Sequence, residues 1–410
     1  MDEVMGELMG LTTSDIYVFA EATLEQQQLT WELTGISWAR SSAPPMSLDV
    51  VHARHVYVAR EQHLSQQELS KDGRTRCWVL YLKGYPRQII ASCETTRKTI
   101  LIAKDGISRE GQGYAIASVS TNPIYREQGL AAFLLRHVQE QMDKDSDCSV
   151  LYSDIGKSYY SSLGWRVFPS HQATLTLLSS PTTPPGDSEE GITKPAFRHS
   201  QPARIRYLRV TELPDLCKKD ELDLRKRFEA FPAGDGSTHV AFSPSFPQIM
   251  WQLERAEFMA KSFVDKKQTE TLLPNKGAIT NDGKSWIYWD HDWREKKLKI
   301  LRMSIRVEED GGDHSPTVAW KQQRHRIDDI KVLLEAALAE ASAWGLPKVL
   351  IWNPDAEVTL GCKAAGNAHP YGMKIVFDER KDASIPSLRW AGGADGRDTS
   401  WEDNFYYAWC

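Results

Sequence analysis

The residues best suited to chemistry lie in segment 114–165, where a glycine-containing turn is followed by a Tyr-Tyr pair. The turn, residues 126–131, comes after a strand-like run of small and β-branched residues and opens a segment with helical periodicity. The first amides of a helix have no partner within it, and the helix dipole adds positive charge there, so such a turn favours an anion. Gly129 lets the backbone approach a phosphate closely, and Arg126 adds a positive charge. The pattern therefore predicts a phosphate-binding turn.

The turn differs from two common phosphate-binding motifs. No Gly-Lys-Ser/Thr follows it, as in a Walker loop, and it lacks the three glycines of a dinucleotide fingerprint. Its sequence, Arg-x-x-Gly-x-Ala, resembles the pyrophosphate-binding turn of the GNAT acetyltransferases, although alone it would also suit an ordinary strand–turn–helix connection. Segment 158–165, Ser-Tyr-Tyr-Ser-Ser-Leu-Gly-Trp, resembles the second GNAT signature. Because both signatures occur in the family's order and spacing, the chain is identified as a GNAT member by resemblance.

The sequence around these signatures resembles that of a narrower group, the fungal lysine N6-acetyltransferases of lysine breakdown. Segments 151–165, 78–80 and 90–95 and the tryptophan-rich C-terminal half carry this likeness. The resemblance implies L-lysine, acetylated at its side-chain amine, as the first acceptor to test, but no single residue defines lysine as the acceptor. Two alternatives stay open. The acceptor could be another amine, such as a polyamine, an amino sugar, a toxin or a protein lysine, or the chain could be a coenzyme-A-binding regulatory protein without turnover.

The GNAT resemblance implies acetyl-CoA as cosubstrate and no metal. We expect the exposed edge of segment 119–121 to hold the amides of the pantetheine arm as an added strand would be held. The pyrophosphate is expected at the backbone amides of the turn, beside a basic side chain. The residues expected to bind the coenzyme are Val119, Thr121, Arg126, Gln128, Gly129, Leu130 and Ala131.

Acetyl transfer to an amine also needs a proton donor for the departing thiolate and an acceptor for the amine proton. Tyr160 matches the family's tyrosine, four residues before Gly164, and is the expected general acid. The alternative is that Tyr160 is a packed aromatic and that Tyr159 or Tyr152 acts instead, or that none does. Glu94 and Asp154, at the ends of two predicted strands, are the candidate bases, although each could be a structural carboxylate. Cys93, beside Glu94, fits a small buried thiol better than an acetyl carrier.

The length of 410 residues favours two domains. Residues 1–178 are expected to form a GNAT catalytic domain with a mixed α/β sheet, residues 179–200 a flexible linker, and residues 201–410 a second GNAT-like domain. The first domain is expected to contain helices at 24–40 and 56–69 and strands at 77–82, 88–95 and 98–104.

The second half repeats the order of strand, loop, helix and strand, at 298–305, 327–344 and 348–352. It has no Arg-x-x-Gly-x-Ala at the start of the helix, so we expect it to lack a coenzyme site, to complete the acceptor pocket and to stabilise the first domain. Two further segments each allow two interpretations. Segment 289–293, Trp-Asp-His-Asp-Trp, could bind a cation but fits an exposed hairpin turn better, and segment 401–409 fits core packing better than a pocket for a cationic amine.

Composition narrows the remaining possibilities. A net charge of −5 with dispersed basic residues gives no support for a nucleic-acid or anionic-membrane surface. No apolar run approaches the roughly 20 residues of a membrane helix, and the acidic N-terminus is unlike a targeting peptide. Six scattered cysteines without a C-x-x-C pair indicate reduced thiols. We therefore expect a cytoplasmic protein with a small-molecule amine substrate, while the sequence leaves the oligomeric state open.

Overall fold

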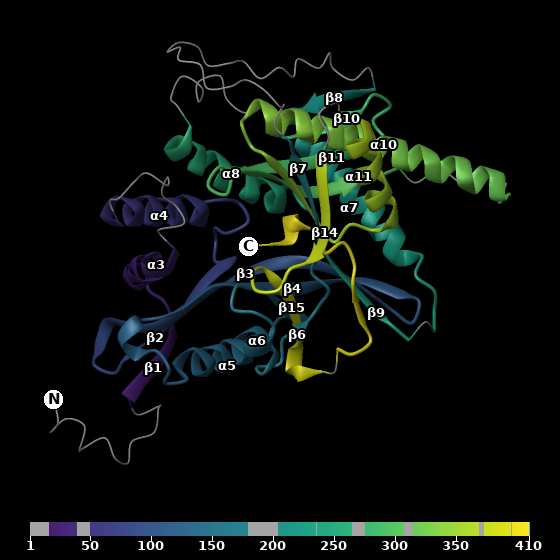
Figure 1. Cartoon of the computed structure of the whole chain (residues 1–410). Coiled ribbons are helices and arrows are strands. Elements are labelled where there is room, and N and C mark those ends of the chain that lie inside the picture. The colour runs from purple at the N-terminus through teal and green to yellow at the C-terminus, as the bar shows by residue number, and fades with distance from the viewer. Residues whose placement is uncertain are drawn as a thin grey trace, which may run out of the picture.

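The computed structural model describes residues 16–38, 50–178, 204–234, 236–264, 275–306, 315–368, 373–394 and 396–409. Within these residues the chain forms two mixed sheets, one of nine strands and one of seven, with helices on their faces (Figure 1). The expected mixed α/β class is therefore confirmed. The expected linker, residues 179–200, lies outside the described residues.

The first sheet has the strand order β1-β2-β3-β4-β5-β15-β6, and β9 also pairs with β3. Helices α3 and α4 lie on one face of this sheet and α5 and α6 on the other (Figure 1). The elements from the N-terminal part are β1 (Tyr17–Glu21), α3 (Leu24–Trp38), α4 (Val50–Ser65), β2 (Thr75–Leu82), β3 (Tyr85–Lys104), β4 (Ile107–Thr121), α5 (Leu130–Met142), β5 (Cys148–Ser153), α6 (Ser158–Ser161) and β6 (Arg166–Val167).

The local predictions in this part hold with two corrections. Residues 98–104 are not a separate strand, because β3 runs without a turn through this region and pairs with β4 as far as Lys104. The second helix begins and ends earlier than predicted, since α4 covers Val50–Ser65. In α5 the predicted apolar face is present: Leu130, Leu134 and Val138 are buried against the sheet.

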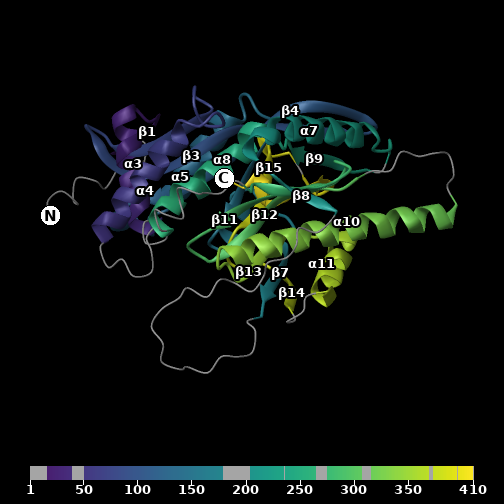
Figure 2. The same cartoon turned by 90° about the horizontal axis from the view of Figure 1, so that it is seen from above.

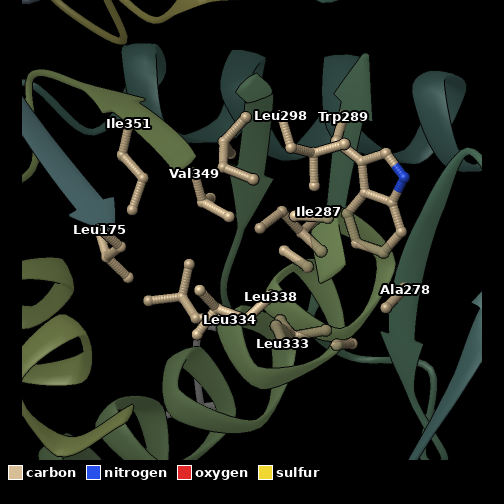
Figure 3. Packing of buried hydrophobic residues seen from close by; sticks show 14 of the residues in the cluster. Leu175, Ala278, Ile287, Trp289, Leu298, Leu333, Leu334, Leu338, Val349 and Ile351 are labelled. Carbon is tan, nitrogen blue, oxygen red and sulfur yellow. The ribbon is translucent and has the colours of Figure 1, made fainter. Parts of the chain in front are cut away.

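The second sheet has the strand order β14-β7-β13-β12-β11-β10-β8. Helix α10 contributes to its core, and its leucines 333, 334 and 338 point toward apolar side chains of the strands (Figure 3). Further elements are β8 (Ile205–Leu208), α7 (Leu213–Glu229), β9 (Thr238–Phe242), α8 (Phe246–Phe263), β10 (Gly277–Thr280), β11 (Trp286–Asp292), β12 (Lys297–Ser304), α10 (Pro316–Ala343), β13 (Lys348–Trp352), α11 (Ala356–Ala368), β14 (Met373–Glu379), β15 (Ile385–Trp390), β16 (Thr399–Trp401) and a 3₁₀ turn, η5 (Tyr406–Ala408).

The two sheets exchange strands. Strand β7 (His171–Leu177), from the N-terminal side of the expected linker, lies between β13 and β14 in the second sheet. Conversely, β15 lies between β5 and β6 in the first sheet. Each exchanged strand buries apolar side chains in its host: Leu175 is fully buried in the second core, and Leu388 packs in a cluster with Val150 of β5. Burial of this area holds the two sheets together.

Segment 289–293 is not an exposed hairpin turn. It spans the end of β11, where Trp289 and Asp290 are fully buried and Asp290 lies 3.2 Å from the ammonium of the buried Lys299. The hydrophobic run that precedes it continues the strand into the core, so the charges are paired inside the protein instead of facing water.

The C-terminal aromatic segment packs against both sheets, since Tyr406 and Tyr407 of η5 share a cluster with Val150 of β5 and Trp352 of β13 (the letter C marks this end of the chain in Figures 1 and 2). Tyr407 is fully buried, and its hydroxyl donates a hydrogen bond to the carbonyl oxygen of Phe242 at 2.5 Å. Core packing, the preferred interpretation, is therefore confirmed for Tyr407. Within the described residues, no helix combines the length and the apolar character needed to cross a membrane.

Candidate active site

One cavity of about 1250 Å³ receives side chains from both sheets. From the first sheet it is lined by the end of β4, the turn before α5, and α6. From the second half it is lined by residues of β11, β13, the segment between β14 and β15, and η5. The strand exchange explains why C-terminal residues reach a cavity built on N-terminal elements, because the chain crosses from one sheet to the other beside it.

The pairing between strands β4 and β5 ends beside this cavity. They are paired in parallel from Gly113 with Cys148 to Ile116 with Leu151, and β4 then continues to Thr121 without described pairing to β5. A bulge follows at once, since the register between β3 and β4 shifts and Ser118 has a positive φ of 56°. Bulges redirect a strand and are frequent beside active sites. The residues of β4 expected to bind the coenzyme, Val119 and Thr121, line the cavity beyond the end of this pairing.

The predicted phosphate-binding turn opens α5 as expected. Gly129 has a φ of 74°, and its carbonyl accepts the helical hydrogen bond of the Phe133 amide at 3.0 Å. By helix geometry, the amides before Phe133 have no partner within α5. A Cβ on Gly129 would meet no atom within 4 Å, so the space beside the turn is open.

The other turn residues fall into two groups. Leu130 and Ala131 line the cavity together with Arg126 and Gly129, whereas Gln128 is exposed and is not among the lining residues. The Arg126 guanidinium donates to the carbonyl of Thr121 at 3.3 Å and to Ser37 Oγ at 3.4 Å. These contacts hold the arginine at the end of β4, beside the first amides of α5.

Tyr160 lies on α6 and lines the cavity, although only 9% of it is exposed. Its ring packs edge-on against Tyr159, with the ring centroids 5.1 Å apart, and against Trp165 at 6.3 Å. Burial raises the pKa of Tyr160 above its ordinary value, and nearby Tyr159 adds to the shift. The phenol therefore keeps its proton at neutral pH, which a proton donor requires.

Glu94 lies in β3 and faces the same cavity. The indole of Trp31 donates to its Oε1 at 3.1 Å, and Ser118 Oγ donates to its Oε2 at 3.2 Å. Burial, followed by the repulsion of the nearby Glu61 carboxylate, raises the pKa of Glu94 to about 7, while the two hydrogen bonds and Arg60 oppose the shift. A carboxylate with this pKa can accept a proton at neutral pH and release it again.

Asp154 lines the cavity too, but it is exposed and already engaged. Its Oδ1 accepts a hydrogen bond from the backbone amide of Ser384 at 2.8 Å, which ties the loop after β5 to the segment between β14 and β15. Of the two candidate bases, Glu94 therefore has the environment that general base chemistry needs, and Asp154 has that of a structural carboxylate.

Cys93 is buried with a thiol pKa raised well above its usual value by burial, so it forms no reactive thiolate. In the described part of the chain, no group of three or more His, Cys, Asp or Glu side chains could hold a metal ion.

Sequence reasoning missed several residues of the site. The ion pair of Arg60 with Glu61 on α4 lines the cavity and influences Glu94, and Trp31 of α3 holds the carboxylate. No motif marks these residues, because they belong to ordinary helices and reach the site only through packing. Arg380, between β14 and β15, was missed because no motif marks it either.

A comparison with known protein families shows to which family the chain belongs. A family model described as the LYC1 GNAT-like C-terminal domain matches residues 192–410, which is more than half of the chain. The chain belongs to the LYC1 GNAT-like family. This confirms the resemblance to GNAT proteins and to the lysine acetyltransferase group, and it assigns the C-terminal half to a GNAT-like domain, as predicted.

A lysine acetyltransferase from Yarrowia lipolytica is 25% identical over 272 residues to this LYC1-like chain, in a match that covers 58% of this chain and 65% of the relative. The match thus spans just under two thirds of the relative's length. Among solved structures, Eis1 from Mycobacterium abscessus is 11% identical, with 92% of this chain and 74% of that chain covered and a TM-score of 0.46. A GCN5-related N-acetyltransferase from Kribbella flavida is 15% identical, with 92% and 72% covered and a TM-score of 0.44.

Proposed function

We propose that this LYC1-like protein is an acetyl-CoA-dependent N-acetyltransferase that acts on an amino group of a small molecule, with the side-chain amine of L-lysine as the first candidate. One observation carries the proposal: the turn at the start of α5, a buried Tyr160 and a Glu94 with a pKa of about 7 all line the same cavity. An anion site, a proton donor and a proton acceptor are the three parts that such a reaction needs from the protein.

The residues present fit the coenzyme. The end of β4, beyond its pairing with β5, offers backbone groups to the amides of the pantetheine arm, in the manner of an added strand. The open space beside Gly129 leaves the first amides of α5 accessible to a diphosphate, with Arg126 held nearby. Val119, Thr121, Gly129, Leu130 and Ala131 would hold the coenzyme, and Gln128 would contribute through its backbone amide. When bound, acetyl-CoA supplies the acetyl group as a reactive thioester.

The protein's main task on the acceptor side is to remove a proton. A lysine side chain has a pKa of about 10.4, so its deprotonation near pH 7 costs about 4–5 kcal/mol. The Glu94 carboxylate, buried and held at both oxygens by Trp31 and Ser118, takes this proton from the amine directly or through a water. Asp154 is the second candidate, but its contact with the Ser384 amide gives it a positioning role.

On the leaving side, Tyr160 Oη holds a proton and delivers it to the departing thiolate sulfur. The packing of its ring against Tyr159 and Trp165 fixes the direction of the hydroxyl and excludes water from one side. The buried environment that keeps the phenol protonated also strengthens its hydrogen bond to a developing negative charge.

In this proposal the two halves of the chain have different roles. Residues 1–178 bind the coenzyme and carry the acid and base, and residues 201–410, joined to them by 179–200, complete the acceptor pocket and stabilise the first sheet. Support comes from the cavity lining, which includes Trp352, Arg380 and Tyr406 from the second half. The insertion of β15 beside β5 supports the stabilising role.

The choice of lysine rests on the kinship with the Yarrowia lipolytica relative, which is a lysine acetyltransferase by name. A panel of amines tests it: purified full-length protein is mixed with acetyl-CoA and with L-lysine, polyamines, amino sugars or lysine peptides, and release of free coenzyme thiol is measured. The highest kcat/KM is expected for L-lysine. A higher value for another amine would replace lysine as the acceptor, and tight acetyl-CoA binding without release for any amine would make the chain a coenzyme-binding protein without turnover.

A further inference from the structure

Arg380 carries a buried positive charge inside the proposed active-site cavity, and no described carboxylate forms an ion pair with it. Its Nε, Nη1 and Nη2 atoms are all buried, and among the residues that the structure describes none accepts a hydrogen bond from them. Several other buried cationic side chains of this protein have carboxylate partners. Arg302 donates to Asp220 at 2.7 Å, and Lys299 lies 3.2 Å from Asp290. A buried guanidinium without an acceptor is costly, and no described residue supplies one to Arg380, so an anionic ligand would stabilise it.

The side chain is oriented for recognition of a planar anion. The Arg380 Cζ lies 3.6 Å from the centroid of the Trp352 ring, so one face of the guanidinium is covered by the indole. The N–H donors of a guanidinium lie in its plane, and no described residue accepts a hydrogen bond from those of Arg380. This arrangement leaves a fork of donors that matches the two oxygens of a carboxylate.

The backbone holds Arg380 in place. Its amide donates to the carbonyl oxygen of Ser170 at 3.1 Å, and the Ser170 hydroxyl donates to the Arg380 carbonyl at 3.0 Å. Four residues later the Ser384 amide is held by Asp154 at 2.8 Å. The segment that crosses from β14 to β15 is therefore fastened at both ends to the first half of the chain, and its arginine lines the cavity.

The pKa of Arg380 is consistent with a site for an anionic ligand. Burial lowers its pKa to about 10, against the opposing influence of Tyr152, Tyr406 and Asp378. The guanidinium thus remains charged at neutral pH. A carboxylate beside it would replace the missing hydration and reverse the shift.

We propose that Arg380 binds the carboxylate of a free amino acid acceptor, so that the enzyme selects amines that also carry a carboxylate. This inference rests on the proposed transferase function and deepens it. It distinguishes a free amino acid from a polyamine and from a lysine within a peptide, neither of which offers a carboxylate at the same distance from the reacting amine.

The test compares L-lysine with L-lysinamide, in which a neutral amide replaces the carboxylate, for the wild type and Arg380→Gln. The wild type should prefer lysine in kcat/KM by on the order of 10- to 100-fold, the range for a hydrogen bond between charged groups. Arg380→Gln should lose about this factor for lysine and change little for lysinamide, and Arg380→Lys should restore part of the loss. Lys381→Gln, which removes a neighbouring exposed charge that also lines the cavity, is the control and should keep the preference.

The KM for acetyl-CoA separates the two possible sources of the anion. It should be unchanged in Arg380→Gln, and a rise matching the loss for lysine would assign the arginine to the coenzyme phosphates and overturn the inference. Equal rates of the wild type with lysine and lysinamide would also overturn it, without need of any variant, while the transferase function would stand. Absence of coenzyme release with every amine would overturn both.

Discussion

The hydroxyl of Ser118 donates a hydrogen bond to Oε2 of Glu94 at 3.2 Å, across the bulge between β3 and β4. Ser118 reaches this position because its backbone adopts a φ of 56°, a conformation that few residues other than glycine accept. Strands β3 and β4 pair on both sides of this bulge, whereas the pairing of β4 with β5 has already ended at Ile116. One local irregularity therefore places a hydrogen-bond donor for the proposed base in the part of β4 that lines the cavity.

The first prediction concerns the pH dependence of the reaction. With Glu94 as base and a pKa of about 7, kcat/KM should rise about tenfold per unit below pH 7 and level off above it, since only the carboxylate accepts a proton. Glu94→Gln should lower the rate at pH 7 by about 10²–10³-fold, and its rate should keep rising toward the amine pKa of about 10.4.

The control for this prediction is Glu295→Gln, which removes an exposed carboxylate from the lining of the same cavity. It should leave the profile of the wild type intact. Stopped-flow or steady-state assays of coenzyme release at pH values from about 5.5 to about 9 measure the pH profiles of the wild type and the variants. An unchanged profile in Glu94→Gln would exclude this carboxylate as the base and return Asp154 to consideration.

The second prediction separates Tyr160 from its neighbour. Tyr160→Phe removes the proposed proton donor but keeps the ring that packs against Trp165, so acetyl-CoA should bind normally while kcat falls by about 10²-fold. Tyr159→Phe, a half-buried phenol in the same cavity, should reduce kcat by no more than a few fold. The reverse order of the two effects would transfer the role to Tyr159.

The third prediction addresses the turn at α5. Gly129→Ala places a Cβ on a residue with a φ of 74°, which costs about 1 kcal/mol of stability, and the Cβ projects into the open space where a diphosphate would lie. The KM for acetyl-CoA should rise about tenfold or more. Gly84→Ala, with a φ of 80° and equal space in the turn between β2 and β3, should lose similar stability and keep the KM. Thermal unfolding and coenzyme saturation curves measure the two quantities, and equal KM values would argue against the turn as the phosphate site.

The fourth prediction tests the strand exchange. Leu388 of β15 is 2% exposed and packs in a cluster with Val150 of β5, so Leu388→Ala should lower the free energy of unfolding by about 2–4 kcal/mol. Phe377→Ala, on the exposed side of β14, should cost less than about 1 kcal/mol. Denaturant titration gives both values. A small loss for Leu388→Ala would mean that β15 is not part of the first core.

Much of the local structure could be predicted from the sequence, because it depends on neighbours along the chain. The spacing of apolar residues gives α5, and Gly129 after Arg126 marks the turn that opens it. The cavity brings together the predicted Glu94 and Tyr160 with this turn.

What could not be predicted depends on contacts between distant segments. Nothing in the residues of β7 and β15 favours one sheet over the other, and only tertiary packing assigns each strand to the opposite one. Segment 289–293 has the composition of a hairpin turn, but its charges are neutralised inside the protein by Lys299. Arg380 has no motif, and its importance follows only from the absence of an acceptor around its buried side chain in the described structure.

The most direct test is the reaction itself. Full-length protein, confirmed as folded by circular dichroism, is incubated with acetyl-CoA and L-lysine, and coenzyme release and the acetylated amino acid are followed together. The account predicts saturable release with formation of lysine acetylated at the side-chain amine in equal amount, and loss of both in the doubly substituted Glu94→Gln, Tyr160→Phe variant. A folded protein that neither binds acetyl-CoA in calorimetry nor releases coenzyme with any amine would contradict it.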